Sequence, residues 1–292
     1  MGDTIIRGTA ANAAVRVFVA DTEELVNEAF RIHKTTPVMT AALGRLLTAG
    51  AIMGTMLKGE ADVQTLTIAG DGPAGKITVT ADSHGRVKGV SENSKVDIPL
   101  KPNGKLDVSG AVGKGQLTVV RDMGLKEPYV GTTELVSGEI AEDLTYYFTV
   151  SEQVPSSVGL GVLVDTDYSV RRAGGFIVQL MPFAEEEVIS TLEKNLACIT
   201  SVTQLYEEGK SAEDIFRMLV NGLPYEIFDS IKPEYKCDCS KDRVTKALIA
   251  LGKAELDNMI EDGEPIEVHC DFCDTYYRFS LEELNDIKAY CR

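Results

Sequence analysis

Alternation of apolar and polar residues dominates the first 180 residues of the chain. In such a stretch every second side chain would face a core, which is the pattern of a half-buried β-strand. Turn signals rich in Gly, Asp and Asn separate the stretches. The alternating stretches are residues 14–20, 65–68, 76–80, 116–120 and 176–180.

Helical patterns interrupt these strands at three places. Thr22 is placed to cap a helix that ends near residue 34, and residues 40–57 are rich enough in Ala, Leu and Met for a buried helix. A third helix is predicted over 137–151, with Ser137 as its N-cap. Strands mixed with helices, without regular βαβ alternation, predict an α+β domain with a largely antiparallel sheet over residues 1–182.

A helical pattern replaces the alternation after Pro182. Residues 184–209 contain no turn signal and carry an apolar stripe at helical spacing. Ser211 and Asp214 have the spacing of a helix N-terminus, and Gly222 lies near the end of that second helix. Residues 183–232 are therefore predicted to form a helical linker rather than an independent domain.

The remaining residues, 233–292, are predicted to form a small third unit. A domain of this size buries too little apolar surface to be more than marginally stable by itself. The predicted elements are helices over 240–251 and 253–262, hairpin arms over 266–270 and 276–279, and a last helix opened by an S-x-x-E capping box at Ser280 and Glu283.

Charge and composition exclude several kinds of partner. The chain has 29 Lys and Arg against 45 Asp and Glu, a net charge of −16, which disfavours nucleic acid and anionic membranes because both attract basic surfaces. No apolar run approaches the roughly 18 residues of a membrane span. The first residues carry Asp3 and Arg7 where a signal peptide would be apolar. We therefore expect a protein of the reducing cytoplasm.

Six cysteines in a cytoplasmic protein indicate metal binding or redox chemistry rather than structural disulfides. Four of them form a C-x-C and a C-x-x-C pair: Cys237, Cys239, Cys270 and Cys273. Two cysteine pairs on separate turns supply the tetrahedral thiolate shell that structural Zn²⁺ prefers, so we expect one zinc ion per chain. Four buried free thiols and two constitutive disulfides are the alternatives.

A shell of four cysteines leaves no open position for water or substrate, which argues against zinc catalysis and against an enzyme. His269 is a candidate alternative ligand, but its side chain should point to the strand face opposite that of Cys270. Two other motifs are expected to be turns. These are the G-x-G-x-x-G of residues 70–75, which a strand follows instead of a helix, and the Asp82-Ser83-His84 run.

The chain resembles the 33 kDa chaperonin family, the redox-regulated heat-shock holdases of bacteria. The resemblance covers essentially the whole chain. In the C-terminal part it is carried by Cys237-Asp-Cys239-Ser240, Leu251-Gly252, Cys270-Asp-Phe-Cys273 and Tyr277-Arg-Phe279. In the N-terminal part it is carried by Gly70-Asp-Gly-Pro73, Glu139-Ile-Ala-Glu-Asp-Leu144, Ser151-Glu-Gln-Val-Pro155 and Gly174-Gly175.

The resemblance implies an ATP-independent chaperone of the stress response that binds unfolded client proteins. Its reduced, zinc-bound form would be inactive. Oxidation would release zinc and form the disulfides Cys237–Cys239 and Cys270–Cys273, exposing client-binding surface, and self-association as a homodimer is expected. Cys198 and Cys291 lie outside the motif. We interpret Cys198 as a small core residue and Cys291 as exposed and incidental.

Zinc contributes more to a small domain than two short disulfides can replace, so oxidation is expected to unfold the third unit. Linker helices packed against that unit would lose their support. Residues from about 183 onward would then unfold, while residues 1–180 stay folded.

The sequence is also compatible with two other functions. A thiol–disulfide oxidoreductase using Cys270 and Cys273 is one, although thioredoxin-like chemistry places its C-x-x-C at a helix N-terminus rather than at a hairpin. A zinc-ribbon nucleic-acid module is the other. Residues 234–292 carry 8 Lys and Arg against 14 Asp and Glu, which speaks against it.

Overall fold

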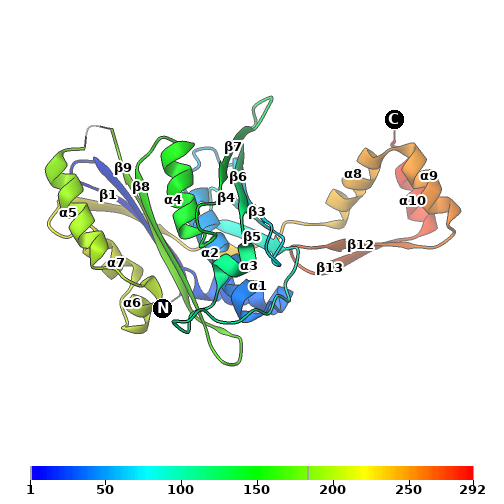
Figure 1. Cartoon of the computed structure of the whole chain (residues 1–292). Helices are drawn as coiled ribbons and strands as arrows, with labels where there is room; N and C mark the ends of the chain where they lie inside the picture. The colour runs from blue at the N-terminus through cyan, green and yellow to red at the C-terminus, as the bar shows by residue number, and fades with distance from the viewer. Residues whose placement is uncertain (1, 183, 292) are drawn as a thin grey trace. The chain divides into compact units, whose positions relative to one another are not determined.

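The computed structural model describes residues 2–182 and 184–291, which form two compact units, Met1–Lys236 and Cys237–Arg292 (Figure 1). Residue 183, the first of the predicted linker, lies outside the described residues. The predicted α+β class is confirmed, because both units combine helices with sheets that are antiparallel except at one short pairing.

A five-stranded sheet forms one layer of the larger unit. Its strand order is β10-β1-β2-β9-β8, and all its neighbours are antiparallel. Its strands, in chain order, are β1 (Thr4–Ala10), β2 (Val15–Asp21), β8 (Ser156–Val164), β9 (Val170–Leu180) and β10 (Tyr225–Ile231).

A six-stranded sheet forms the second layer, in the order β11-β5-β4-β3-β6-β7. The G-x-G-x-x-G motif is the turn between β3 and β4, as predicted. The strands are β3 (Val63–Gly70), β4 (Lys76–Asp82), β5 (Arg86–Ser91), β6 (Gly115–Asp122), β7 (Tyr129–Glu134) and the two-residue β11 (Glu234–Tyr235), which pairs with β5 in parallel.

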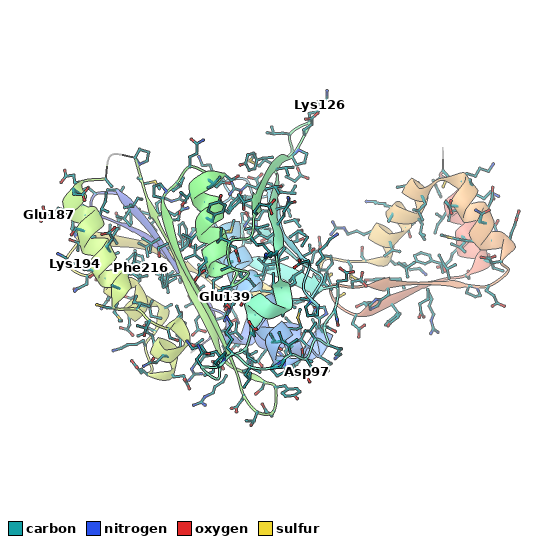
Figure 2. The ribbon with its side chains drawn as sticks, in the orientation of Figure 1. Asp97, Lys126, Glu139, Glu187, Lys194 and Phe216 are labelled. Atoms are coloured by element: carbon teal, nitrogen blue, oxygen red, sulfur yellow. The ribbon has the colours of Figure 1, made fainter. Side chains whose placement is uncertain are left out.

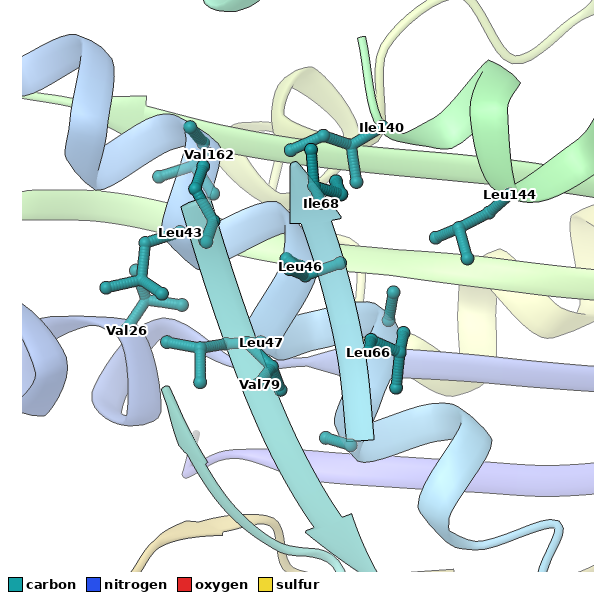
Figure 3. Packing of buried hydrophobic residues seen from close by; sticks show 14 of the residues in the cluster. Val26, Leu43, Leu46, Leu47, Leu66, Ile68, Val79, Ile140, Leu144 and Val162 are labelled. Carbon is teal, nitrogen blue, oxygen red and sulfur yellow. The ribbon is translucent and has the colours of Figure 1, made fainter. Parts of the chain in front are cut away.

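Helix α2 (Pro37–Gly54) lies in the core of this unit, where Leu43, Leu46 and Leu47 pack among residues from both sheets (Figure 3). By length and hydropathy it is the one helix among the described residues that would cross a membrane, but 89% of it is buried in the protein. It is therefore a core helix. The other helices that come before residue 182 are α1 (Glu23–His33), α3 (Val108–Val112) and α4 (Ala141–Val150).

Two of these helices begin differently from the prediction. The Thr22 side chain does not cap α1. Instead the carboxylate of Asp3, two strands earlier in the chain, accepts hydrogen bonds from the Glu24 and Leu25 N–H groups at 2.8 and 2.7 Å. Helix α4 starts at residue 141 rather than 137. The buried Asp143 carboxylate accepts the N–H groups of residues 136–138 and 140, which fixes them as a loop.

The predicted linker is partly strand and is packed on the larger unit. Its helices are α5 (Glu186–Ala197), α6 (Val202–Glu207) and α7 (Ala212–Leu219), and the expected single helix over 184–209 is broken where Ser201 caps α6. The apolar stripe is real, but β1, β2 and β9 bury it. The expectation that these helices rest on the third unit was therefore wrong. The division at residues 182 and 232 remains a prediction.

Phe216 anchors this packing. Its side chain (labelled in Figure 2) is fully buried where α7 meets β1. Its ring lies so close to Gly8 that a side chain at that position would clash with it. We predict that Phe216→Ala lowers the free energy of unfolding of the reduced protein by about 3–5 kcal/mol, because the cavity removes a large apolar contact. Urea unfolding measures this. The matched Phe228→Ala, at a ring that is 59% exposed, should change stability by less than about 0.5 kcal/mol.

The smaller unit is close to the prediction. Its helices pack around a core of five buried side chains: Leu248, Leu256, Phe279, Leu284 and Ile287. The capping box of Ser280 and Glu283 is formed. The elements are α8 (Lys241–Leu251), α9 (Lys253–Glu261), the antiparallel hairpin of β12 (Ile266–Cys270) and β13 (Thr275–Phe279), and α10 (Leu281–Lys288).

Candidate metal centre

Four cysteine sulfurs converge within the smaller unit. The Sγ atoms of Cys237, Cys239, Cys270 and Cys273 all lie within 4.8 Å of one another. The first two come from the irregular segment before α8, and the other two from the end of β12 and the turn that follows it. The cysteine spacing in the sequence predicted these four residues as one site, and their sulfurs lie close together in the structure.

The sulfur spacing fits a tetrahedral metal. The distance from Cys237 Sγ to Cys270 Sγ is 3.7 Å, and that from Cys239 Sγ to Cys273 Sγ is 3.2 Å. Four sulfurs at ~2.3 Å from a central Zn²⁺ would be about 3.8 Å apart. Soft thiolate donors select zinc over hard cations such as magnesium or calcium. The donor set and its spacing therefore fit one structural zinc ion with no open coordination position.

The turn after β12 aims its two cysteines the same way. The N–H groups of Cys273 and Asp274 both donate to the Cys270 carbonyl, at 3.2 and 2.9 Å. Asp274 has φ of 58°, a left-handed conformation that returns the chain to β13. The C-x-x-C thus lies at a hairpin turn and not at a helix N-terminus, where thioredoxin-like chemistry requires it.

Backbone N–H groups support negative charge on the sulfurs. Those of Cys239, Phe272 and Thr275 hydrogen-bond the sulfurs of Cys237, Cys270 and Cys273 respectively. Without a metal, burial still raises the pKa of the Cys237 thiol to about 12. Burial also acts to raise the pKa of Cys273, but hydrogen bonds with Thr275 and Cys239 outweigh it and lower that pKa to about 7.

Tyr277 is a contributor that the spacing of the cysteines did not reveal. Its hydroxyl donates to Cys239 Sγ at 3.0 Å, and this bond to the thiol raises the pKa of Tyr277 to about 12. We predict that Tyr277→Phe weakens zinc binding about tenfold, as losses of hydrogen bonds to metal ligands do. Competition with a chromogenic chelator measures it. Tyr276→Phe, at the exposed neighbour, is the control, and equal losses in both variants would rule out the hydrogen bond as the cause.

His269 is not part of the cluster. Its ring nitrogens bond instead to Asp271 and Asp274, at 3.1 and 2.7 Å, on the exposed face of the hairpin. This agrees with the expectation that its side chain points away from Cys270. The Ser83-His84 pair lies in the exposed turn between β4 and β5, also as expected.

The two remaining cysteines differ from the predictions. Cys198 is exposed at the C-terminus of α5, because it lies off the helix face that carries Leu192 and Leu196. Its prediction as a core residue was wrong. Cys291 is half-buried and packs against the small core of its unit, with Sγ 3.6 Å from the Ile249 carbonyl. It was predicted to be exposed.

The fold and this centre define a class of protein, a two-sheet α+β unit joined to a small C-terminal unit built on four cysteines. The family model of the Hsp33 protein matches residues 3–280. The chain is 56% identical to the 33 kDa chaperonin of Lachnoclostridium phytofermentans, over 98% of both chains. It is 55% identical to that of Agathobacter rectalis, over 99% of this chain and 100% of the relative.

The solved structures agree. The crystal structure of the 33 kDa chaperonin (heat shock protein 33 homologue) from Thermotoga maritima matches with a TM-score of 0.91 and 39% identity, covering 99% of each chain. The chain belongs to the Hsp33 family of chaperones.

Proposed function

We propose that this protein is a redox-regulated, ATP-independent holdase of the cytoplasm that is active when oxidised and inactive when reduced. The single observation that carries the proposal is the convergence of Cys237, Cys239, Cys270 and Cys273 in a unit with only a small apolar core. When bound, zinc would hold the four sulfurs as thiolates and stabilise this unit.

Oxidation by peroxide would then form two disulfides, Cys237–Cys239 and Cys270–Cys273. Each disulfide takes two electrons from a cysteine pair and reduces one hydrogen peroxide to two waters, so two peroxides are consumed and the metal is released. The proposed partners are the thiols that are neighbours in the sequence, because these stay within reach of each other once the metal has left and the unit unfolds. Both disulfides close loops of three or four residues, worth roughly 2 kcal/mol each, against ~10–16 kcal/mol for structural zinc.

The loss of zinc stabilisation would unfold the smaller unit, and release of the linker from the five-stranded sheet would follow. The apolar surface uncovered in this way would bind unfolding client proteins and favour a homodimer. No catalytic turnover is required, because capture of a client needs only an exposed surface.

The test measures zinc content and suppression of aggregation on the same sample, before and after peroxide with mild heat. We expect about one zinc per reduced chain and little suppression, then loss of zinc and strong suppression after oxidation. Suppression that is equal in the two states would contradict redox control. Insulin reduction is assayed in parallel, because turnover there would indicate an oxidoreductase instead.

A further inference from the structure

Strand β10 closes one edge of the five-stranded sheet by pairing with β1. Its anchors are the partly buried Ile227 and Ile231 and the edge contact of Tyr225 with the Phe216 ring. Five of its seven residues are exposed, among them Phe228 at 59%, and its pairing is interrupted between Arg7 and Gly8. A strand with little buried surface and an irregular ladder is readily detached. It also lies in the linker, which is the segment we propose to unfold on activation.

A groove lies beside this pairing. Its first part, of about 310 Å³, is lined by Phe18, Met56, Phe228 and the backbone of Gly8. A second part of about 340 Å³ shares Arg16, Met56, Leu57 and Lys58 with the first and adds Met53 and Met123. Methionine side chains are flexible and polarisable, so a wall of this kind adapts to many apolar partners.

The charge of this groove is opposite to that of the chain as a whole. Arg7 pairs with both carboxylate oxygens of Asp229 on β10. The half-buried Arg16 lies with its guanidinium 5.2 Å from the centre of the Phe18 ring. Among the residues that the structure describes, Arg16 has no carboxylate partner. Burial and the neighbouring Arg7 guanidinium both lower the pKa of Arg16. The first part of the groove therefore holds the basic side chains of Arg7, Arg16 and Lys58, and Asp229 is the acid paired with Arg7, whereas Asp62 and Glu152 line the second part.

Strand β10 itself shows what this edge accepts. Asp229 places a carboxylate on Arg7, Phe228 places an aromatic ring in the groove, and the backbone of β10 completes the sheet. When β10 leaves, β1 presents unpaired N–H and C=O groups along its edge. Arg7 and Arg16 are then left side by side without a carboxylate, which attracts an acidic segment and repels a basic one.

We propose that the edge of β1, once β10 has left it, takes up an extended client segment that carries apolar and acidic side chains as a replacement strand. The inference rests on the proposed function, because release of the linker is part of the activation described there. Backbone pairing gives affinity without regard to sequence, as in other cases of strand addition. The Met-lined groove and the two arginines add the preference for apolar and acidic side chains.

The probe is a fluorescein-labelled peptide YEIFDSI, the sequence of β10, compared with YKIFKSI, in which lysine replaces both acidic residues. Fluorescence anisotropy measures their binding to the full chain. We expect the protein that has been oxidised and warmed, so that the linker is released, to bind the acidic peptide at least tenfold more tightly than the lysine peptide, and the reduced protein to bind neither. Arg16→Glu should weaken the acidic peptide about tenfold and improve the lysine peptide. Arg31→Glu, with the same charge change at an exposed site, should do neither.

Three results would overturn the inference: equal affinity of the oxidised protein for both peptides, the same effect from both charge reversals, or oxidised dimers that suppress aggregation yet exclude the peptide. The last result would assign the edge to a second copy of the chain. Aggregation is measured on the same samples. Suppression without peptide binding refutes the inference alone, whereas selective peptide binding without suppression refutes the proposed function and supports the edge site.

Discussion

Replacing Cys270 and Cys273 by serine is expected to abolish zinc binding and to unfold residues 237–292, while the larger unit keeps its fold. The two substitutions together remove half of the sulfur shell. Structural zinc contributes ~10–16 kcal/mol in small peptides, which is as large as the whole stability of a typical domain at ~5–15 kcal/mol. Five buried side chains cannot compensate for that loss.

Metal analysis should fall from about one zinc per chain to near zero. Limited proteolysis should then cut within residues 237–292 and spare β1 to β9. The matched control is Cys198→Ser with Cys291→Ser, which also removes two thiols but leaves the cluster intact and should retain zinc. Retention of zinc by the Cys270 and Cys273 variant, or a protease-resistant smaller unit without zinc, would contradict the assignment of the site.

Peroxide oxidation is expected to remove hydrogen-exchange protection in two stages. The smaller unit and the linker have separate apolar cores, the first around Leu284 and the second around Phe216. Zinc loss destabilises only the first, so residues 237–291 should lose protection at 25 °C. Residues 186–231 should follow only on warming, because their packing on the sheet must still be broken. Protection in β2 and β9 should remain in both stages.

The Phe216→Ala variant provides the control for this order. With the linker core weakened, both regions should lose protection together at the lower temperature, and aggregation suppression should appear without heat. Peptide mapping of the same oxidised samples should find Cys237–Cys239 and Cys270–Cys273. Mainly long-range links, such as Cys237 to Cys273, or an unchanged linker in a fully active protein, would show that activation follows another route.

Local sequence patterns correctly predicted the features that involve residues only a few positions apart. The four cysteines, the capping boxes at Ser211 and Ser280, and the five alternating strands all depend on residues a few positions apart, and the structure contains them. Strand β8 was missed because glycines at 159 and 161 break its alternation. Strand β10 was missed because its residues are mostly exposed and so show no buried face.

What the sequence did not reveal depends on contacts between distant segments. Asp3, just before β1, caps α1, and nothing near Thr22 indicates that its hydroxyl bonds to Thr48 instead. The apolar stripe of the linker could be recognised in the sequence. Such a stripe indicates that one face of a helix is buried, but it does not indicate which part of the protein covers that face. Tyr277 followed from no spacing rule, although it lies on the second arm of the hairpin whose first arm ends at Cys270, where it pairs with Val268.

The short-range contacts of residues 237–292 also bear on how fast this unit would refold after its disulfides are reduced. The hairpin closes through one tight turn, and α8 and α9 are separated by a single glycine, so most contacts join neighbours in sequence. Chains with such local contacts fold within microseconds to milliseconds. Thiol–disulfide exchange takes seconds to hours. Under the proposed function, the time for which a client is held would therefore be set by the supply of reductant and zinc, because refolding of residues 237–292 is fast by comparison.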